Sequence, residues 1–160
     1  MSQSHLSKNY HGLMIKIDGV ILTRLRQIMD ERGGVLHMFR NDAPEYKKFG
    51  ECYFSEVLPG SVKAWKLHKK QSQNLAVPIG RIRLVIFDPR KVSPSYLKLQ
   101  VIELGRPDAY FRLHIPNGLW YGFSCISKDR ALIVNCADMI HDSDETQIMP
   151  IEVADIPYSW

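Results

Sequence analysis

The sequence predicts an all-β fold of the sandwich or barrel type, on three observations. About ten short segments rich in β-branched, aromatic and aliphatic residues follow one another at regular spacing. Turn residues such as Asp-Gly, Pro-Gly and Asn-Gly separate these segments, and almost no stretch has the periodicity of a helix. At 160 residues the chain has room for one substantial core, so we expect a single domain over residues 1–160.

The first third of the chain is expected to consist of an arm followed by short strands. Residues 1–10 have no strand pattern and form a loose arm in this interpretation. Residues 23–30 could form a helical turn by composition, but their short length and the neighbouring strands favour extended structure. The strands expected here cover residues 13–17, 19–22, 35–42 and 51–58, with turns at Asp18-Gly19, Asp30–Gly34 and Pro59-Gly60 and a loop over 43–50.

The stretch from Gly60 to Arg90 is predicted to contain a strand, a polar turn and a second strand. Successive side chains of a strand point to opposite faces. The face with His68 would also carry Val62, Ala64, Lys66 and Lys70, and the other face would carry Lys63, Trp65 and Leu67. Around His68 this face is cationic, whereas the inside of a β-fold is normally apolar, so the face is expected to line a wet cavity. We therefore look for function around His68.

The remaining segments complete the β pattern without an internal repeat. A proline-rich connection follows Phe87, and an acidic loop covers residues 141–145. Strands are expected over residues 97–104, 110–116, 119–127 and 131–138, a short edge segment over 147–153, and turns at 105–108, Asn117-Gly118 and Asp129-Arg130.

Composition and charge argue against several classes of protein. No apolar run approaches the roughly 18 residues of a membrane-spanning helix. The start of the chain lacks the pattern of a secretory signal, so we expect a cytoplasmic protein. Its 3 cysteines are scattered and form neither a disulfide framework nor a CxxC metal motif. The net charge of +4 favours an anionic partner, but the chain lacks the basic stripe of a nucleic-acid-binding protein, so a phosphorylated small ligand fits better.

Four stretches of the chain carry a resemblance to a known family. They are DERGGVLHMF from Asp30, WKLHKKQSQNLAVPIGRIRLVIFDPR from Trp65, SPSYLKLQVIEL from Ser93 and IPNGLWYGF from Ile115, and the tail with Glu145 and DIPYSW continues them. In this order they resemble the dTDP-4-dehydrorhamnose 3,5-epimerase family of the cupin superfamily, of which this chain would be a divergent short member. The resemblance implies a double-stranded β-helix, or jelly roll, that binds a nucleotide-diphosphate sugar. It also implies a homodimer with N-terminal strands, and with them the arm, exchanged across the interface.

The resemblance further implies roles for individual residues. His68 takes the place of the family's base, which removes a proton next to a 4-keto group. The family's donor tyrosine falls at Val134, and the acidic partner of the base belongs to a segment beyond Trp160, so His68 is expected to lack that partner. Tyr121, which replaces a histidine of the family, is a candidate acid, and Tyr53 is another.

Five residues are expected to bind substrate. Arg32 and Glu145 are kept from the family's motifs, Lys66 and Lys70 share the strand face of His68, and Asn74 lies near the place of a family lysine. The metal-binding version of the cupin site needs two histidines one residue apart and a later third one. Here Lys70 and Tyr121 stand at the second and third of those positions, so we expect no metal, and the family implies no cofactor.

Three functions are open on this basis. The first is an epimerase or related isomerase acting on a nucleotide-linked 4-keto-6-deoxy sugar in deoxysugar or cell-surface polysaccharide biosynthesis. The second is a catalytically degenerate cupin that binds a nucleotide sugar or a partner protein. The third is a sugar 3,4-ketoisomerase. A carboxylate within hydrogen-bond reach of His68, and a tyrosine hydroxyl across the cavity, would favour catalysis.

Overall fold

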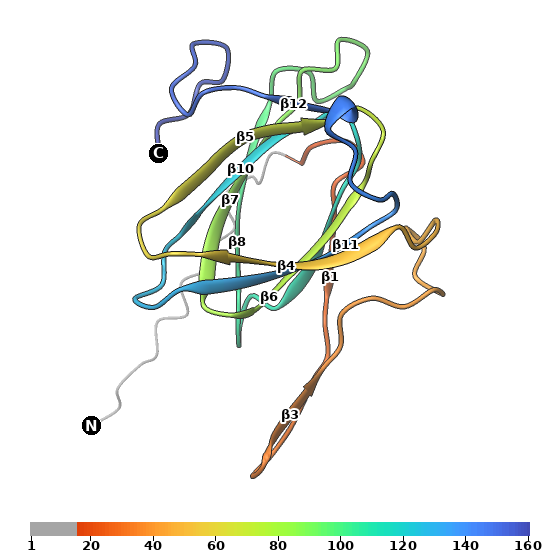
Figure 1. Cartoon of the computed structure of the whole chain (residues 1–160), viewed down its shortest axis with the longest axis vertical. Coiled ribbons are helices and arrows are strands. Elements are labelled where there is room, and N and C mark those ends of the chain that lie inside the picture. The colour runs from red at the N-terminus through yellow and green to blue at the C-terminus, as the bar shows by residue number, and fades with distance from the viewer. Residues whose placement is uncertain (1–15) are drawn as a thin grey trace, which may run out of the picture.

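The computed structural model describes residues 16–160, which consist of strands, connecting loops and one short 3-10 turn (Figure 1). The strands are β1 Ile21–Arg24, β2 Gln27–Asp30, β3 Gly33–Leu36, β4 Glu51–Val57, β5 Val62–His68, β6 Gln73–Ile79, β7 Arg81–Phe87, β8 Leu99–Gly105, β9 Phe111–Ile115, β10 Trp120–Cys125, β11 Ala131–Ala137 and β12 Thr146–Ile148, and the turn η1 is Ser143–Glu145. These elements confirm the all-β class. The arm expected over residues 1–10 and most of the strand expected over 13–17 lie outside the described residues. Within residues 16–160, no helix is long and apolar enough to cross a membrane.

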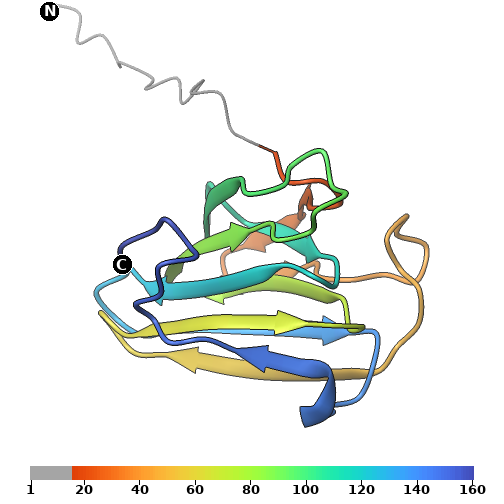
Figure 2. The ribbon, with the colours of Figure 1, turned by 90° about the horizontal axis from the view of Figure 1, so that it is seen from above.

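Two antiparallel five-stranded sheets face each other, which is the jelly-roll arrangement of a cupin (Figure 2). The first sheet has the order β1-β9-β6-β11-β4 and the second has the order β12-β5-β10-β7-β8. Apolar side chains from both sheets form the main core between them, among them Val57, Ile82, Leu84, Ile86, Leu113 and Ile133. Burial of this apolar surface is the main force that holds the two sheets together.

The stretch from Gly60 to Arg90 contains three strands, whereas the sequence predicted two. Gly80 makes the additional break, because its φ of +74° is a conformation that side chains rarely adopt. The turn at Gly80 carries the chain from β6 in the first sheet to β7 in the second. Both strands contain valine and isoleucine, and no turn dipeptide such as Asn-Gly or Asp-Gly separates them, so the sequence does not mark this break.

Gly80 and Gly60 offer a matched test of what this turn requires. Both have a left-handed φ, but a Cβ at Gly60 would meet no atom within 4 Å, whereas a Cβ at Gly80 would lie 2.6 Å from the Cα of Ala131. We expect Gly60→Ala to lower the free energy of unfolding by about 1–2 kcal/mol, the cost of the left-handed backbone. Gly80→Ala should cost about 1–3 kcal/mol more, because the neighbouring backbone must move. Equal urea midpoints for the two variants would contradict this account.

The N-terminal hairpin of β2 and β3 differs from the predicted pattern in its boundaries. The turn is confined to Glu31 and Arg32, because Gly33 and Gly34 already pair in β3. The strand expected over residues 35–42 ends at Leu36, after which the chain turns along the outside of the first sheet. Residues 23–30 are extended, as expected, and form the end of β1 and the whole of β2. Figure 1 shows that this hairpin projects away from both sheets.

The outer faces of the two sheets are covered by different parts of the chain. The C-terminal tail covers the second sheet, where Tyr158 and Trp160 pack against Trp65. The segment that follows β1 covers the first sheet, where Leu25 lies in a small apolar cluster with Val134. Outward side chains beneath these coverings, such as Tyr158's neighbour Trp65 and Leu25's neighbour Val134, are therefore buried on the outer faces of the sheets.

Candidate active site

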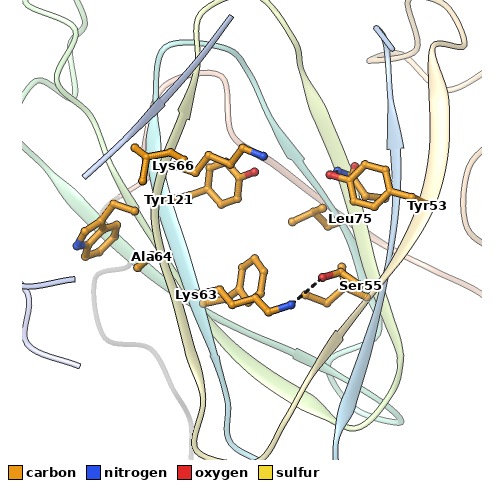
Figure 3. Close-up of a pocket in the computed structure, with 12 residues that line it drawn as sticks. Tyr53, Ser55, Lys63, Ala64, Lys66, Leu75 and Tyr121 are labelled. Atoms are coloured by element: carbon orange, nitrogen blue, oxygen red, sulfur yellow. Dashed lines mark hydrogen bonds between the residues drawn. The ribbon is translucent and has the colours of Figure 1, made fainter. Parts of the chain in front are cut away.

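A cavity of about 400 Å³ lies between the two sheets, at the end where the apolar core stops (Figure 3). It has two opposed walls that carry polar groups. The β5–β10 wall contributes Lys63, Ala64, Trp65, Lys66, Tyr121 and Phe123, and the β4–β11 wall contributes Tyr53, Ser55, Ile133 and Asn135, with Leu75 of β6 and Ile148 of β12 completing the lining. A second hollow of about 340 Å³ shares Tyr53 and Lys66 with this cavity and is also lined by His68 and Gln71. The polar space expected around His68 is thus present.

A β-bulge in β5 changes which lysines face the cavity. Tyr121 pairs with Lys66 but Phe123 pairs with Lys63, so three steps along β5 match two along β10. As a result, Lys63 and Lys66 both point into the cavity, although strict alternation assigned them to opposite faces (Figure 3). The ammonium of Lys63 donates to the Ser55 hydroxyl at 3.3 Å and to the Glu56 carbonyl at 2.7 Å, so it bridges the two walls.

His68 forms a buried pair with Glu145, which corrects the expectation that His68 lacks a carboxylate partner. β12 pairs with β5 so that Thr146 lies opposite His68, and this places Glu145 beside the imidazole. Nδ1 of His68 hydrogen-bonds one carboxylate oxygen of Glu145. The other oxygen accepts the backbone N–H groups of Lys70 and Gln71, each at 3.1 Å. With only 4% of its surface exposed and both oxygens engaged, Glu145 is positioned to orient His68 rather than to bind substrate.

The protonation of this pair follows from its surroundings. Burial lowers the pKa of His68 below its usual value, although the hydrogen bond to Glu145 opposes that shift. Burial disfavours ionisation of Glu145, but the hydrogen bonds from His68 and from the Gln71 and Lys70 backbone outweigh it and lower the pKa of the carboxyl. At neutral pH the pair is therefore a neutral imidazole and a carboxylate. Nδ1–H then donates to Glu145, which leaves the lone pair on Nε2 as the basic site.

Tyr121 lies beside His68, on the same wall of the cavity. Its hydroxyl is 3.2 Å from Nε2 of His68, and the two rings are stacked with their centroids 6.1 Å apart. Burial raises the pKa of Tyr121, so the phenol stays protonated and donates its proton to the Nε2 lone pair. Tyr121 thus occupies the basic nitrogen when no substrate is bound.

Tyr53 lies on the opposed wall, on the neighbouring strand to Asn135. Figure 3 shows Tyr53 across the cavity from Tyr121. Its hydroxyl oxygen accepts a hydrogen bond of 2.8 Å from the side-chain amide of Asn135. Burial raises the pKa of Tyr53, and the bond from Asn135 opposes that rise. Both walls of the cavity therefore carry a tyrosine hydroxyl.

Three of the residues expected at the site lie elsewhere. Arg32 is at the tip of the β2–β3 hairpin, where it pairs with Asp30 and its side chain is 84% exposed. Asn74 points outward and hydrogen-bonds His114 at 2.9 Å. Lys70 is exposed beyond the end of β5 and contributes its backbone N–H to Glu145. The homodimer with exchanged N-terminal strands stays a prediction, which sedimentation of the purified protein would check.

The alignment of the donor tyrosine with Val134 is also resolved by strand alternation. Val134 is buried in the outer cluster with Leu25, whereas its neighbours Ile133 and Asn135 line the cavity. A side chain at position 134 therefore points away from the cavity. Asn135 was not predicted as a site residue, because an asparagine in an apolar strand carries no motif of its own.

The described residues offer no ready metal site. Over 16–160, no group of three or more His, Cys, Asp or Glu side chains is placed to hold an ion. The cavity and the adjoining hollow contain a histidine, two lysine ammonium groups and two phenols, a set suited to moving protons at a carbon next to a carbonyl.

Comparison with known proteins gives consistent matches over most of the chain. A model of the dTDP-4-dehydrorhamnose 3,5-epimerase family matches residues 14–160. The probable low-salt glycan biosynthesis epimerase Agl13 of Haloferax volcanii is 33% identical over 134 residues, which cover 82% of this chain and 85% of that protein. The spore coat polysaccharide biosynthesis protein SpsL of Bacillus subtilis is 27% identical over 146 residues, which cover 90% and 96%.

One solved structure is similar to this chain in both sequence and fold. The crystal structure of a dTDP sugar isomerase from Desulfovibrio desulfuricans is 47% identical and superimposes with a TM-score of 0.88, covering 92% of this chain and 94% of that one. Since the family model spans nearly the whole sequence and relatives of this identity cover most of it, the chain belongs to the dTDP-4-dehydrorhamnose 3,5-epimerase family.

Proposed function

We propose that this protein epimerises a nucleotide-linked 4-keto-6-deoxy sugar by removing a proton from a carbon next to the ketone. The observation that carries the proposal is the buried pair of His68 and Glu145 at a polar cavity between the sheets. The proposal favours catalysis over a degenerate binding protein, because burying an ionised carboxylate against a histidine is costly and a binding cavity has no need of it. The named epimerases among its relatives support the same reaction class.

His68 is the base in this mechanism. Nε2 is unprotonated at neutral pH and lies on the β5–β10 wall, where Tyr121 is its resting partner. Substrate displaces that hydrogen bond, and the proton on the carbon next to the ketone passes to Nε2. Glu145 stabilises the imidazolium that forms, because its carboxylate accepts the Nδ1–H bond.

Lys66 is placed to stabilise the enolate. Proton removal leaves negative charge on the ketone oxygen, and a cation beside that oxygen lowers the barrier. The ammonium of Lys66 points into the cavity between Tyr121 and the opposed wall (Figure 3). Lys63, further from His68 along the same strand, is available for the diphosphate or the sugar hydroxyls.

Inversion requires that the proton return from the face opposite to the base. One wall carries His68 and Tyr121, and the other carries Tyr53. A sugar ring held between the walls would meet a base on one face and a phenol on the other. Proton return from the base itself restores the original configuration.

Proton NMR in deuterated water tests this function. The purified protein is incubated with dTDP-4-keto-6-deoxyglucose, and we expect the C3 proton signal, the C5 proton signal, or both to disappear as a stereoisomer forms. The matched control is dTDP-6-deoxyglucose, which has a hydroxyl in place of the ketone and therefore cannot form an enolate. Binding without exchange would contradict the proposal in favour of a degenerate binder, and accumulation of a 3-keto sugar would contradict it in favour of a ketoisomerase.

A further inference from the structure

The two tyrosines of the cavity have opposite hydrogen-bond roles. The hydroxyl of Tyr121 is 3.2 Å from Nε2 of His68 and donates to it. The hydroxyl oxygen of Tyr53 instead accepts from Nδ2 of Asn135 at 2.8 Å. Within residues 16–160 the structure gives the Tyr53 hydroxyl no acceptor for its own proton, so that proton is free to point into the cavity.

A chain of buried side-chain amides fixes the direction of the bond to Tyr53. Gln71 donates from Nε2 to the backbone carbonyl of Met139 at 2.7 Å, which leaves its Oε1 as an acceptor. Gln73 donates to that Oε1 at 2.6 Å and, through its own Oε1, accepts from Asn135. The Oδ1 of Asn135 accepts the backbone N–H of Asn74 at 3.1 Å.

Backbone groups determine the polarity of this chain at both ends. A carbonyl can only accept and a backbone N–H can only donate, so none of the three amides can be turned over without losing a bond. Asn135 must therefore present its NH₂ group to Gln73 and to Tyr53. Gln71, Gln73 and Asn135 are all buried, and a buried amide is costly unless its hydrogen bonds are satisfied. The three amides are therefore held in one orientation in the cavity wall.

This series of amides begins at Gln71, in the loop whose backbone also binds Glu145. The backbone N–H of Gln71 donates to Glu145, the partner of His68, while the side chain of Gln71 starts the series that ends at Tyr53. The base on one wall and the phenol on the other are thus positioned by one hydrogen-bonded network.

We propose that Gln71, Gln73 and Asn135 are positioning residues that direct the hydroxyl proton of Tyr53 into the cavity, which makes Tyr53 the donor opposite His68. This inference rests on the proposed function. In the second half of the reaction the enolate carbon takes the proton of Tyr53, the C–H bond forms and the O–H bond breaks. The tyrosinate is stabilised by the N–H of Asn135 and is reprotonated by solvent, while imidazolium returns its proton to solvent, so no redox partner is involved.

The test uses Asn135→Asp and Tyr53→Phe with the 4-keto substrate in deuterated water. An aspartate at position 135 accepts the Tyr53 proton rather than donating to its oxygen. Both variants should form inverted product about 10²-fold or more slowly, while exchange at the same carbon with retained configuration persists, because His68 is intact. Tyr121→Phe is the matched control, and it should keep the normal ratio of inversion to exchange. An unchanged ratio in Asn135→Asp would overturn the inference.

A second readout does not depend on turnover or on the aspartate variant folding. The pKa of Tyr53 is followed through the ring-carbon NMR signal of labelled tyrosine in the wild type and in Asn135→Ala, which removes the amide that donates to the Tyr53 hydroxyl. Loss of the ordered donor should raise the pKa of Tyr53, and an unchanged titration would contradict the positioning role. Wild-type protein without any exchange, but with this pKa change, would show that the proposed function fails while the amide chain stands.

Discussion

Replacing His68 with asparagine should reduce proton exchange from the 4-keto substrate by about 10²- to 10⁴-fold, the usual contribution of a positioned general base. Asparagine is chosen because its amide N–H can replace the ring Nδ1–H that donates to Glu145, so the buried carboxylate keeps a partner. Only the basic Nε2 is lost. The rate is measured from the decay of the C3 and C5 proton signals in deuterated water.

His114→Asn is the matched control for this variant. His114 is also buried, also has a lowered pKa, and hydrogen-bonds Asn74 on the outer face of the first sheet. Its replacement removes a buried imidazole without touching the cavity, so the exchange rate per folded molecule should stay at the wild-type level. Equal rates in both variants and the wild type would remove His68 from the mechanism.

Glu145→Gln is expected to have an effect of similar size, through the tautomer of His68. The amide oxygen of glutamine can still accept the N–H groups of Lys70 and Gln71, so the loop keeps its bonds. The amide nitrogen then faces Nδ1 and donates to it, which forces the ring proton onto Nε2. With its basic nitrogen protonated, His68 cannot take the substrate proton, and exchange should fall by up to about 10⁴-fold.

The pH profile separates this effect from simple loss of structure. Burial lowers the pKa of His68, so wild-type exchange should persist as pH falls through about 6.5, the ordinary value, and decline only at lower pH. Glu145 raises the pKa of His68 against that trend. Glu145→Gln lacks this negative charge, so the pKa of His68 should fall further in the variant. The acidic limb of its residual activity should therefore move to still lower pH. Movement of the limb to higher pH would contradict this assignment.

Glu45→Gln is the control for removal of a buried carboxylate. Glu45 pairs with Arg112 beneath the loop that covers the first sheet, away from the cavity. This variant should lower the free energy of unfolding while leaving the exchange rate per folded molecule unchanged. If Glu45→Gln reduced exchange as strongly as Glu145→Gln, both losses would be attributed to lower stability of the fold, and the proposed role of Glu145 would be contradicted.

Much of the fold could be predicted from local signals. Asn117-Gly118 marks the turn between β9 and β10, and the alternating segments on either side are the strands themselves. The break at Gly80 escaped prediction, because β-strand residues lie on both sides of it and no turn dipeptide marks the position. A single glycine between two such strands does not reveal whether it lies within a strand or ends one.

The candidate site was predicted only in part. His68 was found because its strand face is polar, and that signal lies within a few residues. Its pairing with Glu145 joins residues 77 positions apart, and only the pairing of β12 with β5 brings them together. Lys63 was assigned to the wrong face, because a bulge depends on the partner strand as much as on its own sequence. Asn74 and Asn135 each lie in an apolar strand, but Asn135 faces the cavity and Asn74 faces outward. The local sequence is similar in both cases and does not show which face is which.

The sequence by itself determined the class of fold and the family and pointed to the polar strand face of His68, since these depend on local alternation, turn residues and motif order. The tertiary structure decided which carboxylate holds His68, which lysines enter the cavity and which tyrosine hydroxyl accepts a bond from a buried amide. Those properties arise from register, bulges and the polarity of buried hydrogen bonds. Each is set by pairing between strands distant in the chain, so no stretch of sequence contains it alone.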